Sequence, residues 1–170
     1  MFHSRARGSA SKGSAVYPGS FDPITNGHLD IIRRARELFG SVTIAVSNNS
    51  VKNPSFSLNE RQSLIIRSLR ERRLTQGVRV EVFDGLLTDY MRRRGASVVI
   101  RGLRFISDFE SELQMALMNR RLNPAMDTVY LMPDEKHIYL SSSLVKEIAR
   151  LGKNPKAFAP ACVAKALMTL

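Results

Sequence analysis

Short apolar runs alternate along the chain with longer amphipathic segments, and the connections between them are short. The runs have the length of strands, and most are hydrophobic throughout, as expected for strands covered on both faces. They predict strands over 15–18, 42–47, 78–83, 97–101 and 128–132. Because strand-like and helix-like patterns alternate, the chain is predicted to form an α/β domain around a five-stranded parallel sheet.

The amphipathic segments predict helices that cover both faces of this sheet, over 27–39, 58–71, 86–94, 108–122, 142–151 and about 160–170. Two of them begin with the pattern of a capping box, in which a serine precedes a glutamate by three residues. The pairs are Ser57 with Glu60 and Ser107 with Glu110. In an open parallel sheet the ligand binds beyond the carboxyl ends of the strands, so the loops that follow the strands are the candidate site.

A length of 170 residues fits one domain. Residues 1–14 are mostly small and basic and lack an apolar period, so we expect a disordered leader before a domain over 15–170. An organelle transit peptide is the weaker alternative for this segment. The single cysteine, Cys162, lies in an apolar run and is expected to be a buried, inert thiol. No apolar run is long enough to span a bilayer, so no membrane partner and a cytoplasmic location are expected.

The formal net charge of +11 raises the possibility of nucleic-acid binding. Much of that charge, however, lies at the predicted ends of two helices, where cations suit the helix dipole. The residues are Arg67, Arg70, Arg72, Arg73 and 92–94. Aromatic residues are not interleaved with them, so we expect anionic metabolites rather than a polynucleotide as partners.

The segment 17–28 holds the densest chemistry, because it connects the first predicted strand to the first predicted helix. It contains Gly19, Ser20 and His28. A helix N-terminus offers unpaired N–H groups and partial positive charge, which favour a phosphate. His28 would lie in the first helical turn, where the dipole disfavours its protonation; taken alone, it could equally be a capping or merely exposed histidine.

This segment resembles the first signature of the adenylyltransferase branch of the nucleotidyltransferases, through Gly19-Ser20-Phe21-Asp22-Pro23 and Thr25-x-Gly27-His28. Further motifs, in order along the chain, are similar to those of the phosphopantetheine adenylyltransferase family. They lie at Lys52, 56–61, 100–104, 108–112, 118–119 and 141–147. The resemblance covers about 15–170 and implies a Rossmann-like single domain.

The family resemblance implies transfer of AMP from ATP to the 4′-phosphate of phosphopantetheine, which gives dephospho-coenzyme A and pyrophosphate. It also implies a homohexamer and coenzyme A as a feedback ligand. A related transferase with another phosphorylated acceptor, such as nicotinate mononucleotide or a sugar phosphate, is the nearest alternative. A non-catalytic protein that binds nucleotide or RNA is the alternative from a different class.

By the same resemblance, His28 and Ser20 are the catalytic candidates: His28 would stabilise the α-phosphate, and Ser20 would lie between the two substrates' phosphates. The ATP site would comprise Gly19, Ser20, His28, Gly102, Leu103, Arg104, Glu112, His137, Ile138, Tyr139, Leu140, Ser141, Ser142 and Ser143. The acceptor site would comprise Ser20, Lys52, Leu87, Arg101, Met118 and Asn119. Met115 is expected to pack in the core instead.

Two positions depart from a simple assignment. His137 stands where the family often has an aromatic residue, so backbone contacts to ATP are expected there and adenine stacking is left open. Asp22 is either a magnesium ligand or a side chain that binds the backbone of its own turn. Mg²⁺ is implied by the chemistry of ATP, but no protein residues are assigned as its ligands, and we expect phosphate and water to hold it.

Overall fold

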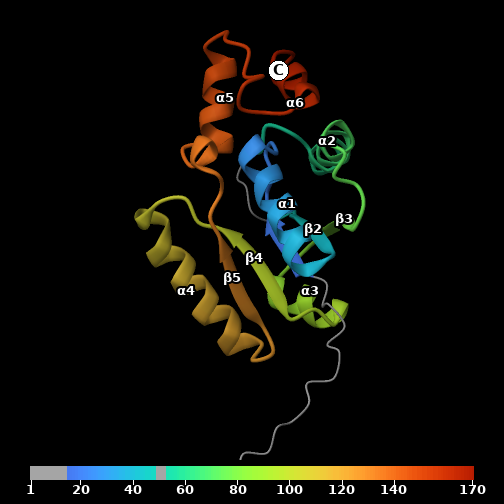
Figure 1. The fold of residues 1–170 in the computed structure, drawn as a ribbon, viewed down its shortest axis with the longest axis vertical. Coiled ribbons are helices and arrows are strands. Elements are labelled where there is room, and N and C mark those ends of the chain that lie inside the picture. Colours follow the sequence, from blue (N-terminus) through green and yellow to red (C-terminus); the bar gives the residue numbers. More distant parts are fainter. Residues whose placement is uncertain (1–14, 49–52) are drawn as a thin grey trace, which may run out of the picture.

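The computed structural model describes residues 15–48 and 53–170. Its strands are β1 (Ala15–Gly19), β2 (Val42–Ser47), β3 (Val78–Phe83), β4 (Val98–Gly102) and β5 (Asp127–Leu131). All pairings are parallel, in the order β3-β2-β1-β4-β5 (Figure 1). The predicted five-stranded α/β sheet is therefore confirmed.

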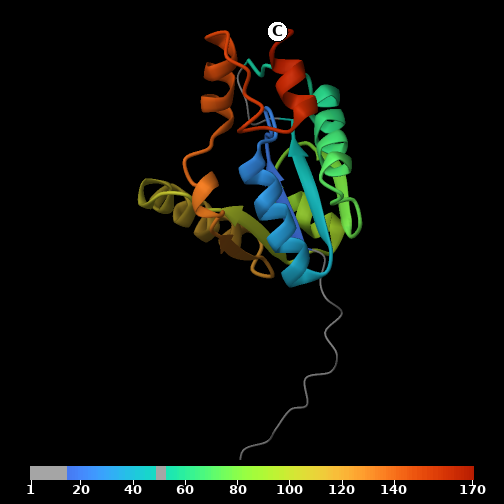
Figure 2. The same ribbon diagram turned by 45° about the horizontal axis from the view of Figure 1, so that its top comes forward.

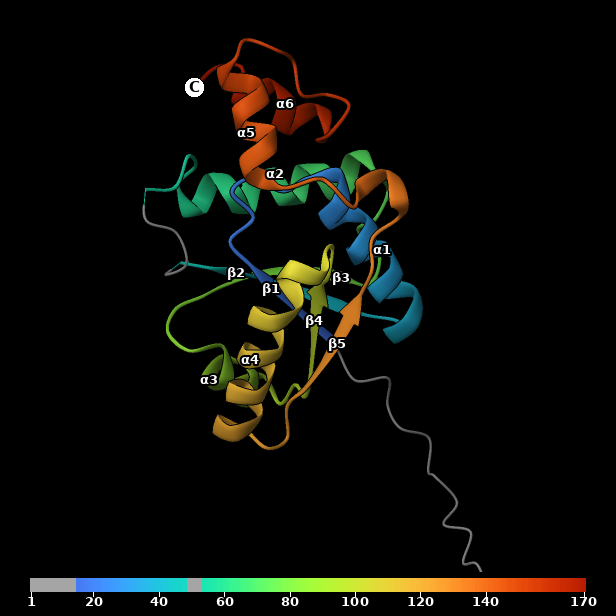
Figure 3. The same cartoon turned by 90° about the vertical axis from the view of Figure 1, so that its left-hand side faces the viewer.

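Helices cover both faces of the sheet. They are α1 (Asn26–Phe39), α2 (Leu58–Glu71), α3 (Leu87–Arg94), α4 (Ile106–Leu122), α5 (Ser142–Arg150) and α6 (Ala161–Leu167), with a 3-10 turn, η1 (Glu135–His137). Helices α1 and α2 pack on one face, and α6 packs against α2 (Figure 2). Helices α3 and α4 lie together on the other side, while α5 stands beyond the carboxyl ends of the strands (Figure 3).

The two faces explain why the strands are continuously hydrophobic. Tyr17 of β1 and Ile100 of β4 belong to the large core beneath α1 and α2. Their neighbours Val16 and Val99 belong to a second core beneath α3. Because successive residues of a strand point to opposite faces, both sets must be apolar when helices cover both sides.

The strand order reverses at β1. The chain passes from β1 to β2 and β3 on one side of the sheet, then returns to place β4 on the other side of β1. The loops after β1 and β4 therefore diverge and leave a crevice at the carboxyl end of the sheet, which is the usual ligand site of such folds. The segment 17–28 lies at this switch point.

Helix starts test the capping predictions. At α2 the prediction is confirmed: Ser57 Oγ accepts the Glu60 N–H at 3.4 Å, and Glu60 Oε2 accepts the Ser57 N–H at 2.8 Å. At α4 it is wrong, because the helix begins at Ile106 and places Ser107 inside the first turn. The N-cap is Phe105, whose side chain makes no capping hydrogen bond. The turn η1 was not predicted.

Two further predictions were that the Cys162 thiol is buried and that the chain has no membrane-spanning segment. Cys162 is 5% exposed, which confirms the buried thiol. None of the helices in the described ranges combines the length and hydrophobicity needed to span a membrane. The predicted leader over 1–14 and Lys52 lie outside the described residues.

Candidate active site

A cleft of about 630 Å³ opens at the carboxyl ends of β1 and β4. It brings together most of the predicted site residues, although they are spread over the sequence from the first strand to α5. Those that line it are Gly19, Ser20, His28, Leu87, Arg101, Gly102, Arg104, Glu112, Asn119, His137, Leu140, Ser141, Ser142 and Ser143. The loops after β1, β3, β4 and β5 meet at this cleft, as predicted, whereas residues 53–56 of the loop after β2 do not line it.

Four described candidates do not line this cleft: Leu103, Met118, Ile138 and Tyr139. Met118 is 57% exposed, and the ring of Tyr139 meets Phe158 edge to face at 6.4 Å. Leu103, Ile138 and Tyr139 are therefore sequence neighbours of lining residues rather than part of the lining itself.

Residues of the cleft that were not predicted from the sequence include Gly85, Leu86, Met115 and Ala116. Met115, predicted to be core, is 55% exposed and lines the cleft with Ala116, so that prediction is wrong. The reason is that α4 offers apolar residues on several sides, and periodicity alone did not show which side is buried. Gly85 and Leu86 also line the cleft. They follow β3 at its carboxyl end, a position that the parallel-sheet rule identifies as a candidate.

His28 lies in the first turn of α1, where it replaces the glutamate of a capping box. Its Nδ1 accepts the backbone N–H of the N-cap Thr25 at 3.0 Å, while Thr25 Oγ1 accepts the backbone N–H of His28 at 3.4 Å. An N–H can bond only to an unprotonated Nδ1, so the neutral ring carries its proton on Nε2. The ring lines the cleft, and Nε2–H is the donor it can offer to a ligand.

Burial keeps His28 neutral. Burial, with a smaller contribution from the positive charge of Arg104, lowers the pKa of the imidazole to about 4. The dipole of α1 acts in the same direction. The capping interpretation of His28 is confirmed, because Nδ1 caps the helix, and the rest of the ring faces the cleft. Its catalytic role stays a prediction.

Phe21 supports this ring from the neighbouring turn. It has a φ of 47°, a conformation that costs a residue with a side chain about 1–2 kcal/mol. Its ring meets His28 at 5.2 Å and Tyr17 at 5.4 Å, both edge to face. A Cβ at Gly19 would lie 3.0 Å from the Phe21 ring, which explains the glycine at this position.

Arg101 and Glu112 form a two-pronged ion pair across the cleft wall. Arg101 Nε donates to Glu112 Oε2 at 2.7 Å, and Arg101 Nη2 donates to Glu112 Oε1. Burial opposes the charge on Arg101, but the hydrogen bonds and charge of Glu112 raise the pKa of the guanidinium. The Glu112 carboxylate therefore binds the two guanidinium N–H donors of Arg101, a residue predicted from the sequence to bind the acceptor phosphate.

Arg104 and the start of α5 form the other basic part of the cleft. Arg104 Nη1 donates to the carbonyl of Leu140 at 2.9 Å and so holds the segment just before α5. Ser141 is the N-cap of α5, and its Oγ accepts the backbone N–H of Leu144 at 3.1 Å. Ser142 Oγ donates to the carbonyl of Pro23 at 2.8 Å. The predicted serine cluster thus opens a helix, as expected.

Asp22 connects three segments through its carboxylate. Its carboxylate, in a residue that is 3% exposed, accepts the N–H groups of Ser55 and Phe56 at 3.0 Å each and Lys146 Nζ at 2.9 Å. Burial alone would raise the pKa of Asp22, but these hydrogen bonds outweigh it and lower the pKa. The predicted bond to its own turn is replaced by bonds to a distant loop and to α5.

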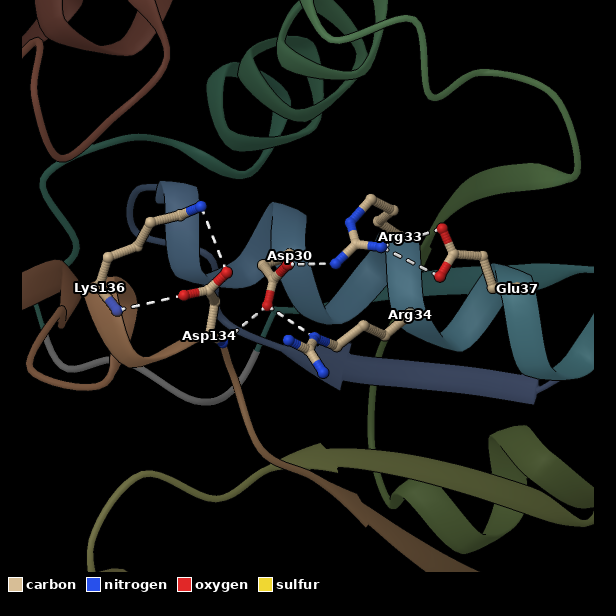
Figure 4. Close-up of polar contacts among 6 residues, drawn as sticks. All are labelled: Asp30, Arg33, Arg34, Glu37, Asp134 and Lys136. Carbon is tan, nitrogen blue, oxygen red and sulfur yellow. Dashed lines mark hydrogen bonds and ion pairs between the residues drawn. The ribbon is translucent and has the colours of Figure 1, made fainter.

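A second carboxylate, Asp30, fixes the loop between β5 and η1 (Figure 4). Its Oδ2 accepts the backbone N–H of Asp134 and Arg34 Nε, each at 2.9 Å, and its Oδ1 accepts Arg33 Nη2 at 2.8 Å. Since Asp30 lies two residues after His28, the same part of α1 that carries the imidazole also holds the loop leading to the predicted ATP segment. His137 ends η1, and its Nδ1 is buried with no hydrogen-bond partner in the part of the chain that the structure describes.

The residues of the cleft do not fit a protein-built magnesium site. Among the described residues, no group of three or more His, Cys, Asp or Glu side chains is close enough to hold a metal ion. Glu112 is paired with Arg101, and Asp22 is paired with Lys146. Hard cations need several oxygen ligands, and this cleft offers mainly cations and hydroxyls.

Comparison with known proteins agrees with this architecture. A family model described as cytidylyltransferase-like matches residues 16–148. Phosphopantetheine adenylyltransferase of Alkaliphilus metalliredigens is 51% identical over 152 residues, which cover 89% of this chain and 95% of that protein. The protein of the same name from Xylella fastidiosa strain M23 is 51% identical over 153 residues, covering 90% and 93%.

Solved structures show the same fold at low identity. A putative nicotinate-nucleotide adenylyltransferase from Vibrio parahaemolyticus has a TM-score of 0.64 at 14% identity and covers 91% of both chains. A bifunctional NMN adenylyltransferase/ADP ribose pyrophosphatase from Francisella tularensis has a TM-score of 0.68 at 16% identity, covering 93% of this chain and 50% of that one.

The parallel sheet, the cleft at its switch point and the matched region define a nucleotidyltransferase of the cytidylyltransferase-like class. The relatives with about half of their residues in common over nearly the whole chain narrow this further. The chain belongs to the phosphopantetheine adenylyltransferase family, as its motifs indicated.

Proposed function

We propose that this enzyme transfers AMP from ATP to the 4′-phosphate of phosphopantetheine. One observation carries the proposal beyond the family: a single cleft collects phosphate-binding groups from the β1–α1 turn, the end of β4 and the first turn of α5. A cleft with donors on several elements suits two phosphorylated substrates held side by side.

In the proposed reaction, an oxygen of the acceptor phosphate attacks the α-phosphorus of ATP in line. The bond to the bridging oxygen breaks, and pyrophosphate leaves with the electron pair. The nucleophile is already ionised, so no general base is needed, and catalysis consists of positioning and charge stabilisation. The neutral His28 suits this task, because its Nε2–H can donate to the α-phosphate without a proton being transferred.

Ser20 and Arg101 complete the proposed arrangement. Ser20 would donate its hydroxyl between the two phosphates, and Arg101 would bind the acceptor phosphate in place of, or together with, Glu112. Lys52 is proposed as a second acceptor-phosphate contact by family resemblance alone. Adenine and ribose would lie along 137–143, which the backbone of η1 and the start of α5 border.

The direct test measures pyrophosphate release from ATP with three acceptors in parallel: phosphopantetheine, nicotinamide mononucleotide and glycerol 3-phosphate. Of the three acceptors, only phosphopantetheine is expected to give turnover. The His28→Ala variant should lose about a hundredfold in kcat while ATP binding by calorimetry changes much less. Preferred turnover with either other acceptor would assign the enzyme to the related transferase instead.

We also propose that the enzyme forms a homohexamer. Large apolar side chains are exposed along α4: Phe105, Phe109, Leu113, Leu117, Met118 and Leu122 are between 39% and 58% exposed. Monomers rarely leave so many large apolar groups in water, so a second copy is the occupant we expect. Sedimentation velocity should give a species of about six chains, and Leu117→Glu should dissociate it.

The proposal also covers the metal ion, a feedback ligand and the cellular location of the enzyme. Mg²⁺ would enter with ATP, held by phosphate oxygens and water, since the cleft supplies no ligand set. Coenzyme A, which shares the pantetheine arm, would act as a feedback ligand that competes with phosphopantetheine. A cytoplasmic location is proposed from the single, buried cysteine and the source of both substrates.

A further inference from the structure

Arg61 of α2 is buried at the edge of the cleft, in a motif whose role the reaction leaves unassigned. Its residue is 2% exposed, and its Nη1 donates to two carbonyl oxygens, those of Ser20 at 2.8 Å and Ser47 at 3.0 Å. Ser20 follows β1, and Ser47 ends β2. Both serines line the cleft. One nitrogen therefore fastens two neighbouring strand ends at the place where phosphates are expected.

No carboxylate among the described residues pairs with the charge of Arg61. Within the described part of the chain, Arg61 takes part in none of the ion pairs, and its Nε is buried without a hydrogen-bond partner. Asp22, the buried carboxylate of the adjacent turn, is already bound by Lys146. A guanidinium stays protonated in proteins, and a buried unpaired cation opposes folding. A buried cation of this kind is best explained by an anion that binds later.

The two carbonyls give a second reason for the cation. Carbonyl oxygens at the carboxyl end of a sheet bring partial negative charge to the region that must accept phosphates. By binding both oxygens, Arg61 reduces that repulsion and also fixes the peptide that follows Ser20. The backbone of Ser20 is then fixed relative to the turn that carries His28, which limits the positions that the Ser20 hydroxyl can take.

We propose that Arg61 is a positioning residue for phosphate binding: it fixes the Ser20 backbone and places buried positive charge beside the phosphate end of the cleft. This inference rests on the proposed function in one respect only, namely that the cleft binds phosphoanhydrides. The identity of the acceptor does not enter it.

The test compares two substitutions at Arg61 with a matched control. Arg61→Met removes the charge, and Arg61→Lys keeps it with fewer donors. Arg67→Met makes the same change at an exposed position of the same helix. Calorimetry with inorganic pyrophosphate measures the anion site without any turnover, and steady-state kinetics gives kcat and KM for each substrate.

We expect Arg61→Met to weaken pyrophosphate binding about tenfold or more, which is about 1.4 kcal/mol. Arg61→Lys should stay within about threefold of the wild type in pyrophosphate affinity but fall about tenfold in kcat, because the Ser20 peptide is less firmly held. Arg67→Met should match the wild type in both. If Arg61→Met does not fold, Arg61→Gln is measured in its place, with the same expected loss.

Unchanged pyrophosphate affinity in a folded, uncharged Arg61 variant would overturn the proposal, and so would an equal loss in Arg67→Met. If Arg61 served stability alone, its variants would unfold more easily while the folded fraction kept normal affinity for pyrophosphate, and that result would overturn the proposal as well. If Arg61→Met weakens pyrophosphate binding as expected but the wild type does not use phosphopantetheine, the proposed function fails and this inference stands.

Discussion

Acid should destabilise the folded protein through His28, and the size of the effect follows from its surroundings. Its pKa is about 4 in the folded protein, against 6.5 for an ordinary histidine. At about 1.36 kcal/mol for each pH unit, the difference corresponds to about 3 kcal/mol. This is an upper limit, because the ring borders an open cleft.

The sign follows from proton binding. Between pH 6.5 and about 4 the unfolded chain holds a proton on His28 that the folded protein does not. The stabilisation from a neutral ring is therefore complete above pH 6.5 and is lost as the pH falls toward 4. The other acidic groups contribute their own losses, so the total acid effect alone cannot isolate His28.

The matched variant is His28→Gln, because glutamine at this third helical position still accepts the N–H of Thr25 but does not titrate. Urea denaturation of both proteins from pH 8 to pH 4 gives the difference in unfolding free energy. The wild type should lose up to about 3 kcal/mol more than His28→Gln over this range. Imidazole ¹⁵N NMR at pH 7 should show the proton on Nε2.

Parallel pH curves for the two proteins would contradict this account of His28. So would an NMR titration midpoint above 6, or a ring with its proton on Nδ1. The last result would also remove the proposed Nε2–H donor from the reaction.

Three other predictions follow from the ion pairs around the cleft. Asp30→Ala should raise the KM for ATP about fivefold, because it releases the loop before η1. The control Glu37→Gln weakens the ion pair between Glu37 and Arg33, which does not touch that loop, and should leave the KM unchanged. Equal KM values of the two variants in steady-state kinetics would refute this. Lys146→Met should lower the free energy of unfolding, measured by urea denaturation, by about 2 kcal/mol. The loss is smaller than for a fully buried ion pair, because the Lys146 side chain is 24% exposed. An unchanged free energy of unfolding would show that the hydrogen bonds of Asp22 suffice without Lys146. Glu112→Gln should free the guanidinium beside it and tighten phosphopantetheine binding by calorimetry about threefold, and weaker binding would mean that Glu112 orients that group.

The fold could be predicted because local signals agree along the chain. The strands at Val42–Ser47 and Val78–Phe83 were bounded correctly, since the first is a mostly β-branched run and the second alternates valine with charged residues, each between clear breaks. Helix α2 was bounded correctly because its capping box is encoded in four adjacent residues. Where the cap carries no side-chain signal, as at Phe105 before α4, the predicted start was two residues late.

The site was predicted less completely, for a different reason. Motifs identified residues such as His28 and Arg101, but their partners come from distant segments. The bonds from Asp22 to Ser55 and Lys146 span 33 and 124 residues. No local pattern indicates such a contact. The pairing of Arg101 with Glu112 was missed likewise, although each was named as a candidate.

The bonds of Asp22 and two further long-range bonds share one segment, the turn between β1 and α1. Asp22 holds the loop after β2 and the Lys146 side chain of α5, the carbonyl of Pro23 accepts Ser142, and the carbonyl of Ser20 accepts Arg61. The proposed reaction uses no covalent catalyst, so its rate depends on how firmly two anions are aligned. The β1–α1 turn supplies that alignment, because the loop after β2, helix α2 and helix α5 all bind to it. These three segments therefore keep fixed positions relative to the turn and to one another. Tolerance to substitution should therefore be lowest at residues that touch this turn, including those that never meet a substrate.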